Sequence, residues 1–239
     1  MIGCECEVCT STNKKDNRLR SSILVQSPTT TIVVDSGPDF RYQMLRQQIK
    51  NLDAILYTHS HKDHIAGLDD TRAYSFFSKK PMQLYADSMT EEAIRREFYY
   101  AFSSSKYPGL PDLNFNEISS DSFTVGDITV SPIHVWHLKM PVLGFRFGKF
   151  TYITDANRIE ETEKEKVKGS DVLVLNALRK QQHISHFSLE EAIDLSQELK
   201  MPTTYFTHVS HQLGRHADVE SELPEGIHLA YDGLELNFS

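Results

Sequence analysis

The stretch THSHKDH, residues 58–64, places three histidines and one aspartate within six positions. It follows an apolar run, DAILYT, that is typical of a buried strand, and the residues after it can begin a helix. These side chains therefore stand at the carboxyl end of a strand, where α/β proteins place their sites. Imidazoles and a carboxylate together suit zinc, manganese or iron. The pattern indicates metal binding by His59, His61, Asp63 and His64 rather than an ordinary polar loop.

The three cysteines of the chain lie together in GCECEVC, as Cys4, Cys6 and Cys9. An odd number of cysteines at this spacing does not make a disulfide framework, and close thiolates in a reducing compartment favour metal. Three sulfur atoms leave a tetrahedral zinc one ligand short, so a fourth ligand, a histidine, is expected from elsewhere in the chain. Three free thiols near a terminus are the alternative.

Composition predicts one ordinary globular domain over residues 1–239. Hydrophobic residues make up 39% and charged residues 24% of the chain, which leaves enough apolar surface for a core. The formal net charge of −8 disfavours binding to nucleic acid or to an anionic membrane. No run is long and apolar enough for a membrane span, and no signal peptide opens the chain, so a cytoplasmic location is expected.

Short β-rich runs bounded by turn residues alternate with helical patterns. Residue Ser188, with Glu191 three positions later, forms the pattern of a capping box at a helix start. The stretch 103–114, rich in Ser, Pro and Gly, is expected to be a loop that forms a wall of the site. This order predicts an α/β sandwich of two mixed sheets with outer helices. Strands are expected at 22–27, 29–37, 52–59, 82–87, 127–136, 143–156, 170–178, 203–209 and 228–238, and helices at 39–51, 89–105 and 188–200.

His-x-His-x-Asp-His at the end of a strand resembles the metallo-β-lactamase superfamily, an αβ/βα sandwich of metal-dependent hydrolases, and the resemblance covers nearly the whole chain. It implies further ligands at later strand ends: His137 in HVWH, Asp155 in YITDA and His208 in YFTHVSH. One ion would then lie on His59, His61 and His137 and the other on Asp63, His64 and His208, with Asp155 bridging both.

A dinuclear site of this kind suits displacement at phosphorus. Two ions about 3.5–4 Å apart clamp the attacking and leaving oxygens and activate water near neutral pH. The donor set does not choose between zinc, manganese, iron and nickel. The resemblance also gives Asp35, in VVDSG, the role of a hydrogen-bonding partner that supports the metal histidines. A plain Asp-Ser-Gly-Pro turn is the alternative for Asp35.

Within the superfamily, the phosphoribosyl cyclic phosphodiesterases of the PhnP type are most similar. They share GCxCxxC, VDSGPDFR, YPGLP and HISHFSLEEA with this chain. This resemblance implies a structural zinc on the three cysteines and His211. It gives His186, before a helix N-terminus, the role of general acid or electrostatic stabiliser, with Asp63 as a second catalytic residue. Residues Tyr107 and Phe115 are expected to shape the pocket.

The function expected is therefore hydrolysis of small cyclic or aryl phosphodiesters of the phosphoribosyl cyclic phosphate type. The alternatives are a phosphodiesterase or nuclease acting on other nucleotides or RNA ends, and a metal-binding protein without turnover. The expected partner is a small-molecule phosphodiester, with no membrane and no nucleic acid, and relatives suggest a homodimer. Packing roles are expected for the remaining histidines: His134, His183, His216 and His228.

The chain departs from the family at its start. Members of this family begin with a strand and a Gly-rich loop before the cysteines, whereas this sequence opens at Met1 with the cysteines close behind. The absent strand is expected to leave one sheet edge unpaired and to remove one wall of the metal pocket.

Overall fold

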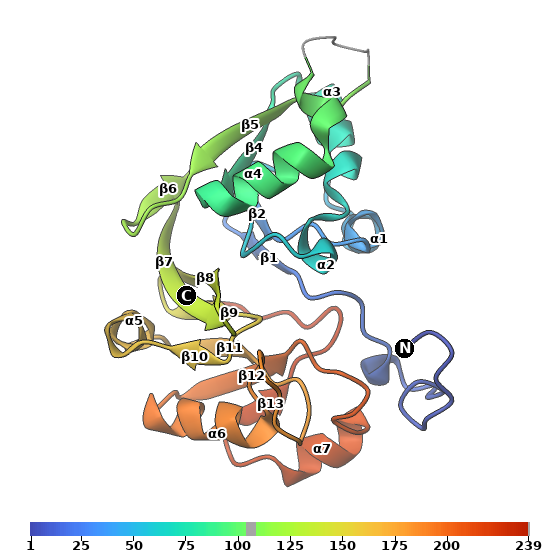
Figure 1. Ribbon diagram of the computed structural model, residues 1–239, viewed down its shortest axis with the longest axis vertical. Helices are drawn as coiled ribbons and strands as arrows, with labels where there is room; N and C mark the ends of the chain where they lie inside the picture. The colour runs from blue at the N-terminus through green and yellow to red at the C-terminus, as the bar shows by residue number, and fades with distance from the viewer. Residues whose placement is uncertain (104–108, 239) are drawn as a thin grey trace. The chain divides into compact units, whose positions relative to one another are not determined.

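A computed structural model describes residues 1–103 and 109–238 of the chain (Figure 1). The chain divides into two compact units. The central unit comprises Arg20–Pro132, and the terminal unit comprises Met1–Leu19 together with Ile133–Ser239. The division falls inside one strand, β7 (Ile128–His137). No helix in the described part of the chain is long and apolar enough to cross a bilayer.

The central unit is built on a sheet of five strands among its described residues, in the order β1-β2-β3-β4-β5. The first pair is antiparallel and the other pairs are parallel, so β2 to β5 end at the same edge. Its strands are β1 (Ile23–Gln26), β2 (Thr31–Val34), β3 (Ala54–Leu56), β4 (Met82–Ala86) and β5 (Leu113–Glu117).

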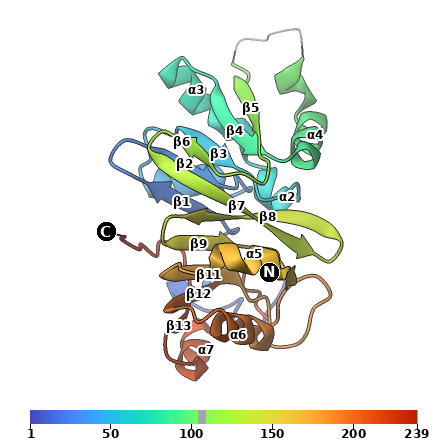
Figure 2. The ribbon, with the colours of Figure 1, turned by 90° about the vertical axis from the view of Figure 1, so that its left-hand side faces the viewer.

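Helices α3 and α4 pack beside β4 in this unit (Figures 1 and 2). Apolar side chains from the sheet and the helices, among them Val33, Phe40, Ile55, Leu84 and Ile94, are buried together. Each such side chain contributes about 1.5–3 kcal/mol when it leaves water. The helical segments are α1 (Phe40–Arg46), α2 (Lys62–Ile65), η2 (Leu68–Thr71), α3 (Arg72–Ser78), α4 (Ser88–Glu97) and η3 (Tyr99–Phe102).

The terminal unit carries the second sheet, in the order β10-β7-β8-β9-β11-β12-β13. The pairs β9–β11, β11–β12 and β12–β13 are parallel, whereas β8–β9 and β10–β7 are antiparallel. A further strand, β6 (Phe123–Val125), pairs with the first residues of β7 in the central unit. The remaining strands are β8 (Met140–Phe147), β9 (Phe150–Ile153), β10 (Arg158–Ile159), β11 (Val172–Asn176), β12 (Thr203–Thr207) and β13 (Ile227–Leu229).

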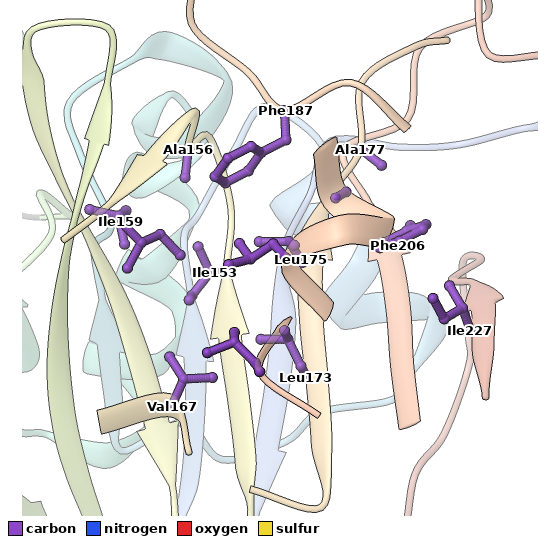
Figure 3. Packing of buried hydrophobic residues seen from close by; sticks show 14 of the residues in the cluster. Ile153, Ala156, Ile159, Val167, Leu173, Leu175, Ala177, Phe187, Phe206 and Ile227 are labelled. Atoms are coloured by element: carbon purple, nitrogen blue, oxygen red, sulfur yellow. The ribbon is translucent and has the colours of Figure 1, made fainter. Parts of the chain in front are cut away.

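Buried apolar residues explain why these parallel strands form. The run VLVLN of β11 is almost continuously apolar, as expected of a strand that is covered on both faces. Figure 3 shows Ile153, Leu173 and Leu175 on neighbouring strands, with Phe206 and Ile227 farther along the sheet. Helix α6 lies along β11 and α7 along β13 (Figure 2). The helical segments of this unit are η1 (Lys14–Asp16), α5 (Glu161–Val167), α6 (Leu189–Glu198) and α7 (His216–Glu222).

Most of the expected elements are present, with identifiable exceptions. The capping box of α6 is confirmed, because Ser188 and Glu191 bond to each other's backbone amides. The expected strand at 228–238 is wrong beyond Leu229, since the described residues 230–238 form no strand. The loop expected at 103–114 ends early, because β5 begins at Leu113. Its residues 104–108 lie outside the described part of the chain.

Candidate metal-binding residues

In the central unit, Asp35 accepts hydrogen bonds from two residues of the histidine stretch, Thr58 and His64. Strands β2 and β3 run parallel with Val34 opposite Leu56, so the residues after the two strands meet at one edge. The Asp35 carboxylate is fully buried and accepts three bonds. They come from the Thr58 amide (2.9 Å), the Thr58 hydroxyl (2.8 Å) and Nδ1 of His64 (2.7 Å). Burial raises the pKa of Asp35, while the adjacent His64 and these bonds oppose that shift.

These bonds set the tautomers of two histidines. The Thr58 hydroxyl donates its hydrogen bond to Asp35, so it accepts the 2.9 Å hydrogen bond from Nδ1 of His59. The Asp35 carboxylate accepts a hydrogen bond from Nδ1 of His64 in the same way. In both rings the lone pair therefore lies on Nε2, the atom that a metal would use. The His59 ring centroid lies 4.6 Å from that of His61 and 4.2 Å from that of His64.

Residue Asp63 lies beside this histidine cluster. Its Oδ2 is 3.8 Å from Nε2 of His64 and 3.8 Å from Nη1 of Arg20. Helix α2 begins directly after His61, and this helix carries both Asp63 and His64. The four residues that the sequence singled out are thus held on one short turn and helix.

Two glycines allow this helix to approach the turn after β2. A Cβ built on Gly67 would lie 2.2 Å from the carbonyl oxygen of Gly37, and one built on Gly37 would lie 2.2 Å from that of Asp63. The Gly67 amide donates to the Ser36 carbonyl at 2.8 Å. The Asp-Ser-Gly-Pro segment is therefore a packing surface for α2, and not only a turn.

In the terminal unit, Asp155 and His208 follow parallel strands at the same sheet edge. Oxygen Oδ1 of Asp155 lies 3.2 Å from Nε2 of His208. Both residues adopt positive φ, 53° and 52°, and Asp35 in the central unit does so at 65°. Such strain in residues without the freedom of glycine is concentrated at functional sites. The Thr154 hydroxyl donates to Oδ2 of Asp155 at 2.9 Å and leaves Oδ1 toward the histidines.

Residues His137 and His186 complete this cluster. Nδ1 of His137 donates to the Ser185 carbonyl at 2.7 Å, so its lone pair is on Nε2. The donor atoms of His137, Asp155 and His186 lie within 4.8 Å of one another. The His186 ring lies 4.5 Å from that of His137 and stacks on His208 at 4.9 Å. Burial lowers the pKa of His186 to about 3 in the metal-free protein, despite Asp155, whose Oδ1 is 3.6 Å from His186 Nδ1.

The cysteine cluster lies wholly within the terminal unit and acquires a fourth donor. The sulfurs of Cys4 and Cys6 each lie 3.4 Å from Nδ1 of His211. All four donor atoms, including that of Cys9, are within 4.8 Å of one another. The bond to His211 lowers the pKa of Cys6 to about 6, which favours the thiolate that zinc requires. Three sulfurs and one imidazole nitrogen fit a closed tetrahedral zinc site.

Each predicted ligand thus lies in a defined environment. Those in the central unit are His59, His61, Asp63, His64 and the supporting Asp35, and those in the terminal unit are His137, Asp155, His208 and the four cysteine-site ligands. The binding of two ions by the histidines and aspartates other than Asp35 and His211 stays a prediction. Of the pocket residues, Tyr107 lies outside the described residues. Phe115 packs 5.7 Å from the Phe102 ring with the guanidinium of Arg95 over both rings, which is a packing role within the central unit.

Sequence reasoning missed the residues that orient these ligands. Thr58 links Asp35 to His59, and the Ser185 carbonyl orients His137. The side chain of Asn176 bonds both the amide and the carbonyl of Ala156 and so fixes the chain beside Asp155. Thr58 is the first residue of the histidine stretch and could have been singled out, whereas Ser185 acts through its backbone and gives no sequence signal.

Comparison with known proteins decides the family. A model of the beta-lactamase superfamily domain matches residues 30–209. The chain belongs to the beta-lactamase superfamily. This confirms the predicted fold class, a metallo-β-lactamase-type αβ/βα sandwich. The crystal structure of a new diphosphatase from the PhnP family matches with a TM-score of 0.93 and 38% identity, covering 100% of this chain and 92% of that one. The resemblance to PhnP is therefore confirmed too.

Curated relatives of this superfamily member carry other names. An octanoyltransferase of Porphyromonas gingivalis is 38% identical over 237 residues, which are 98% of this chain and 48% of that protein. The exodeoxyribonuclease WalJ of Streptococcus pneumoniae is 29% identical over 168 residues, 66% of this chain and 58% of that protein. The chain therefore spans about half the length of the curated relatives it matches. The chain thus has the metallo-β-lactamase fold, and members of this superfamily use divalent metal ions.

Proposed function

We propose that this chain is a metal-dependent phosphodiesterase acting on small cyclic or aryl phosphodiesters, the phosphoribosyl cyclic phosphates included. The observation that supports this most directly is the cluster of His137, Asp155, His186 and His208. Three of these residues are proposed ligands, and His186 lies beside them with its ring stacked on His208. A histidine so placed is within reach of a substrate oxygen that the ligands' ions would bind.

The proposal assigns the histidine and aspartate ligands to two ions. One ion would be held by His59, His61 and His137, the other by Asp63, His64 and His208, with Asp155 shared. Two divalent ions bound there would supply Lewis acidity at the phosphoryl oxygens and activate water near neutral pH. The residues behind the ligands keep the donors in the right tautomer: Asp35 and Thr58 for the central unit, and the Ser185 carbonyl for His137.

The proposal gives His186 and Asp63 distinct tasks. His186 would donate a hydrogen bond or a proton to the phosphate. Asp63 would bind one ion and help to position the attacking water. The cysteine site would bind a structural zinc and tie the amino-terminal segment to the residues directly after His208. Zinc, manganese, iron and nickel all suit the His and Asp donors.

The test is hydrolysis of bis(p-nitrophenyl) phosphate by purified protein with added zinc or manganese, followed by the His186→Ala variant. Turnover that falls about 10²–10⁴-fold in the variant, with the metal content unchanged, would support chemistry at this residue. The variant His228→Gln, in a partly exposed pair with Glu220, is the matched control and should keep full activity. Wild-type protein that holds metal but releases no nitrophenol under any metal would contradict the proposal and favour a metal-binding protein without turnover.

Two relatives suggest rival substrates. The name of the streptococcal relative favours DNA ends, and a labelled single-stranded oligonucleotide tests that reading. The name of the Porphyromonas relative favours an octanoyl group, and release of thiol from an octanoyl thioester tests it. Higher kcat/KM on either substrate than on small phosphodiesters would replace the substrate class proposed here. A small-molecule partner, with a homodimer as its assembly, remains the proposal for the protein's interactions.

A further inference from the structure

The side chain of Asn157 joins segments of the terminal unit that carry residues of the proposed reaction centre. Asn157 lies two residues after Asp155 and directly before β10. Its Oδ1 accepts a hydrogen bond from the Leu138 amide at 2.8 Å, and its Nδ2 donates to the Ile184 carbonyl at 3.1 Å. Its own backbone amide donates to the Trp136 carbonyl at 2.9 Å. One residue therefore links the end of β7, the segment after β9 and the loop before α6.

The bond to Leu138 holds the turn that follows His137. Leu138 begins the turn between β7 and β8 and adopts a φ of 59°, which costs energy in a residue that has a side chain. The bond from its amide to Asn157 offsets part of that cost. Nδ1 of His137 donates to the Ser185 carbonyl, so the loop before α6 also contacts this histidine. The Asn157 side chain thus fixes the backbone directly after His137.

The bond to Ile184 holds the loop that carries His186. The Ile184 side chain is 73% exposed, so packing does little to hold this part of the loop. On the other side of His186, the Phe187 amide donates to the Ala156 carbonyl at 2.8 Å, and these two residues lie close together in Figure 3. His186 therefore stands between two attachments to the segment after β9, one through Ala156 and one through Asn157.

We infer that Asn157 is a positioning residue for the proposed reaction and fixes His186 relative to His137 and Asp155. The inference rests on the proposed phosphodiesterase function. Asn157 does not need to touch the substrate, because it acts through His186, whose ring lies 4.5 Å from that of His137. An asparagine suits this role because one planar amide both accepts and donates a hydrogen bond. A reacting group displaced by about 1 Å can cost about 10²-fold in rate, so a small movement of the loop should lower kcat.

Hydrogen exchange at the Leu138 amide, measured by NMR on metal-free protein, tests the first bond without any turnover. Asn157→Ala removes the acceptor, so this amide should exchange about tenfold faster than in the wild-type protein. Asn157→Asp keeps the acceptor and should keep the slow exchange, while its second oxygen carries no proton for the Ile184 carbonyl. Equal exchange in the wild-type protein and the Ala variant would overturn the inference.

Kinetics with bis(p-nitrophenyl) phosphate test the effect on His186. Asn157→Ala and Asn157→Asp both lose the bond to Ile184, so both should lower kcat about 10- to 100-fold. Their KM and metal content should change less than about twofold, and wild-type kcat in either variant would overturn the inference. The matched control is Asn17→Ala, because Nδ2 of Asn17 also bonds two backbone carbonyls, at 3.4 and 3.2 Å, in the amino-terminal segment. This variant should keep the wild-type kcat.

A double-mutant cycle separates positioning of His186 from a general structural role. In protein that already carries His186→Ala, the further change Asn157→Ala should lower the residual kcat less than about twofold, because residues that act as one unit are not additive. Fully additive losses, or loss of bound metal in Asn157→Ala alone, would overturn the inference and leave Asn157 a structural residue. Absence of turnover in the wild-type protein with any metal would instead refute the phosphodiesterase function, and the positioning role with it, so the two failures are distinguishable.

Discussion

The two units offer metal donors in opposite ways. In the central unit four donors lie on one turn and one short helix, and a single buried carboxylate, Asp35, orients two of them, His59 through Thr58 and His64 directly. In the terminal unit the donors come one at a time from separate strand ends, and two of them have separate supports, the Ser185 carbonyl for His137 and the Thr154 hydroxyl for Asp155. The orientation of donors in the compact motif therefore depends on one buried carboxylate, whereas the approach of the dispersed donors depends on the register of separate strands.

The largest loss of activity is expected from a substitution at Asp155 in the terminal unit. Asp155→Asn removes the charge that would be shared by both ions, so kcat/KM on bis(p-nitrophenyl) phosphate should fall about 10³-fold or more. Metal analysis of the same sample should show loss of active-site metal. The control is Asp171→Asn, at an exposed carboxylate 3.6 Å from Lys149 in the same unit, which should keep both metal and activity. Full metal content and activity in Asp155→Asn would remove this residue from the site.

Removing the Thr58 hydroxyl, which links Asp35 to His59, tests the support of the compact motif. Thr58→Val has a similar shape but lacks the hydroxyl between Asp35 and His59, so Nδ1 of His59 loses its acceptor. Metal affinity and kcat/KM should fall about 10- to 100-fold, as for other groups behind metal ligands. Thr58→Ser keeps the hydroxyl and should behave like the wild-type protein in a metal titration. Equal affinities for the Val and Ser variants would show that the hydroxyl does not orient His59.

Close packing of α2 against the Asp-Ser-Gly-Pro segment predicts a smaller effect, a loss of stability. A methyl group at Gly67 cannot fit 2.2 Å from the Gly37 carbonyl, so Gly67→Ala must move α2 and with it His64. The free energy of unfolding in urea should fall by about 1–3 kcal/mol, the usual cost of overpacking. An Ala variant of wild-type stability would show that α2 has room at this point.

The cysteine cluster gives a pH-dependent prediction on metal-free protein. Because His211 lowers the pKa of Cys6 to about 6, whereas that of Cys4 is raised, Cys6 is mostly thiolate at pH 7. Its alkylation by iodoacetamide should rise through pH 6 and level off by pH 7.5, while the reaction of Cys4 continues to rise above pH 9. Mass spectrometry of alkylated peptides separates the two. Identical profiles would show that His211 does not act on Cys6, and added zinc should protect both.

The same contrast explains what the sequence could predict. The compact motif is visible as a string of letters because all four donors fall within THSHKDH, and so is the cysteine cluster. In sequence, Asp155 looks like an ordinary turn residue and His208 like a packed histidine, so only the family resemblance singled them out. Parallel strand register brings Oδ1 of Asp155 to 3.2 Å from Nε2 of His208. The role of Ser185 belongs to a backbone carbonyl, for which any residue type would serve.

The secondary structure shows a similar limit. Helices α3, α5 and α7 are only seven residues long and were not predicted, because so few residues give weak periodicity. The stretch after β13 has alternating apolar residues but forms no strand in the described chain. Long apolar runs such as β11 were predicted well, because burial on both faces leaves few other solutions.

We propose that the chain holds two catalytic ions in addition to the zinc of the cysteine site. The most direct measurement is the metal content per chain of purified protein, read together with turnover of bis(p-nitrophenyl) phosphate. The account predicts about three metal ions per chain. Turnover should be lost on chelation and restored by added metal. About one ion per chain, lost in Cys6→Ser and accompanied by no turnover, would contradict it.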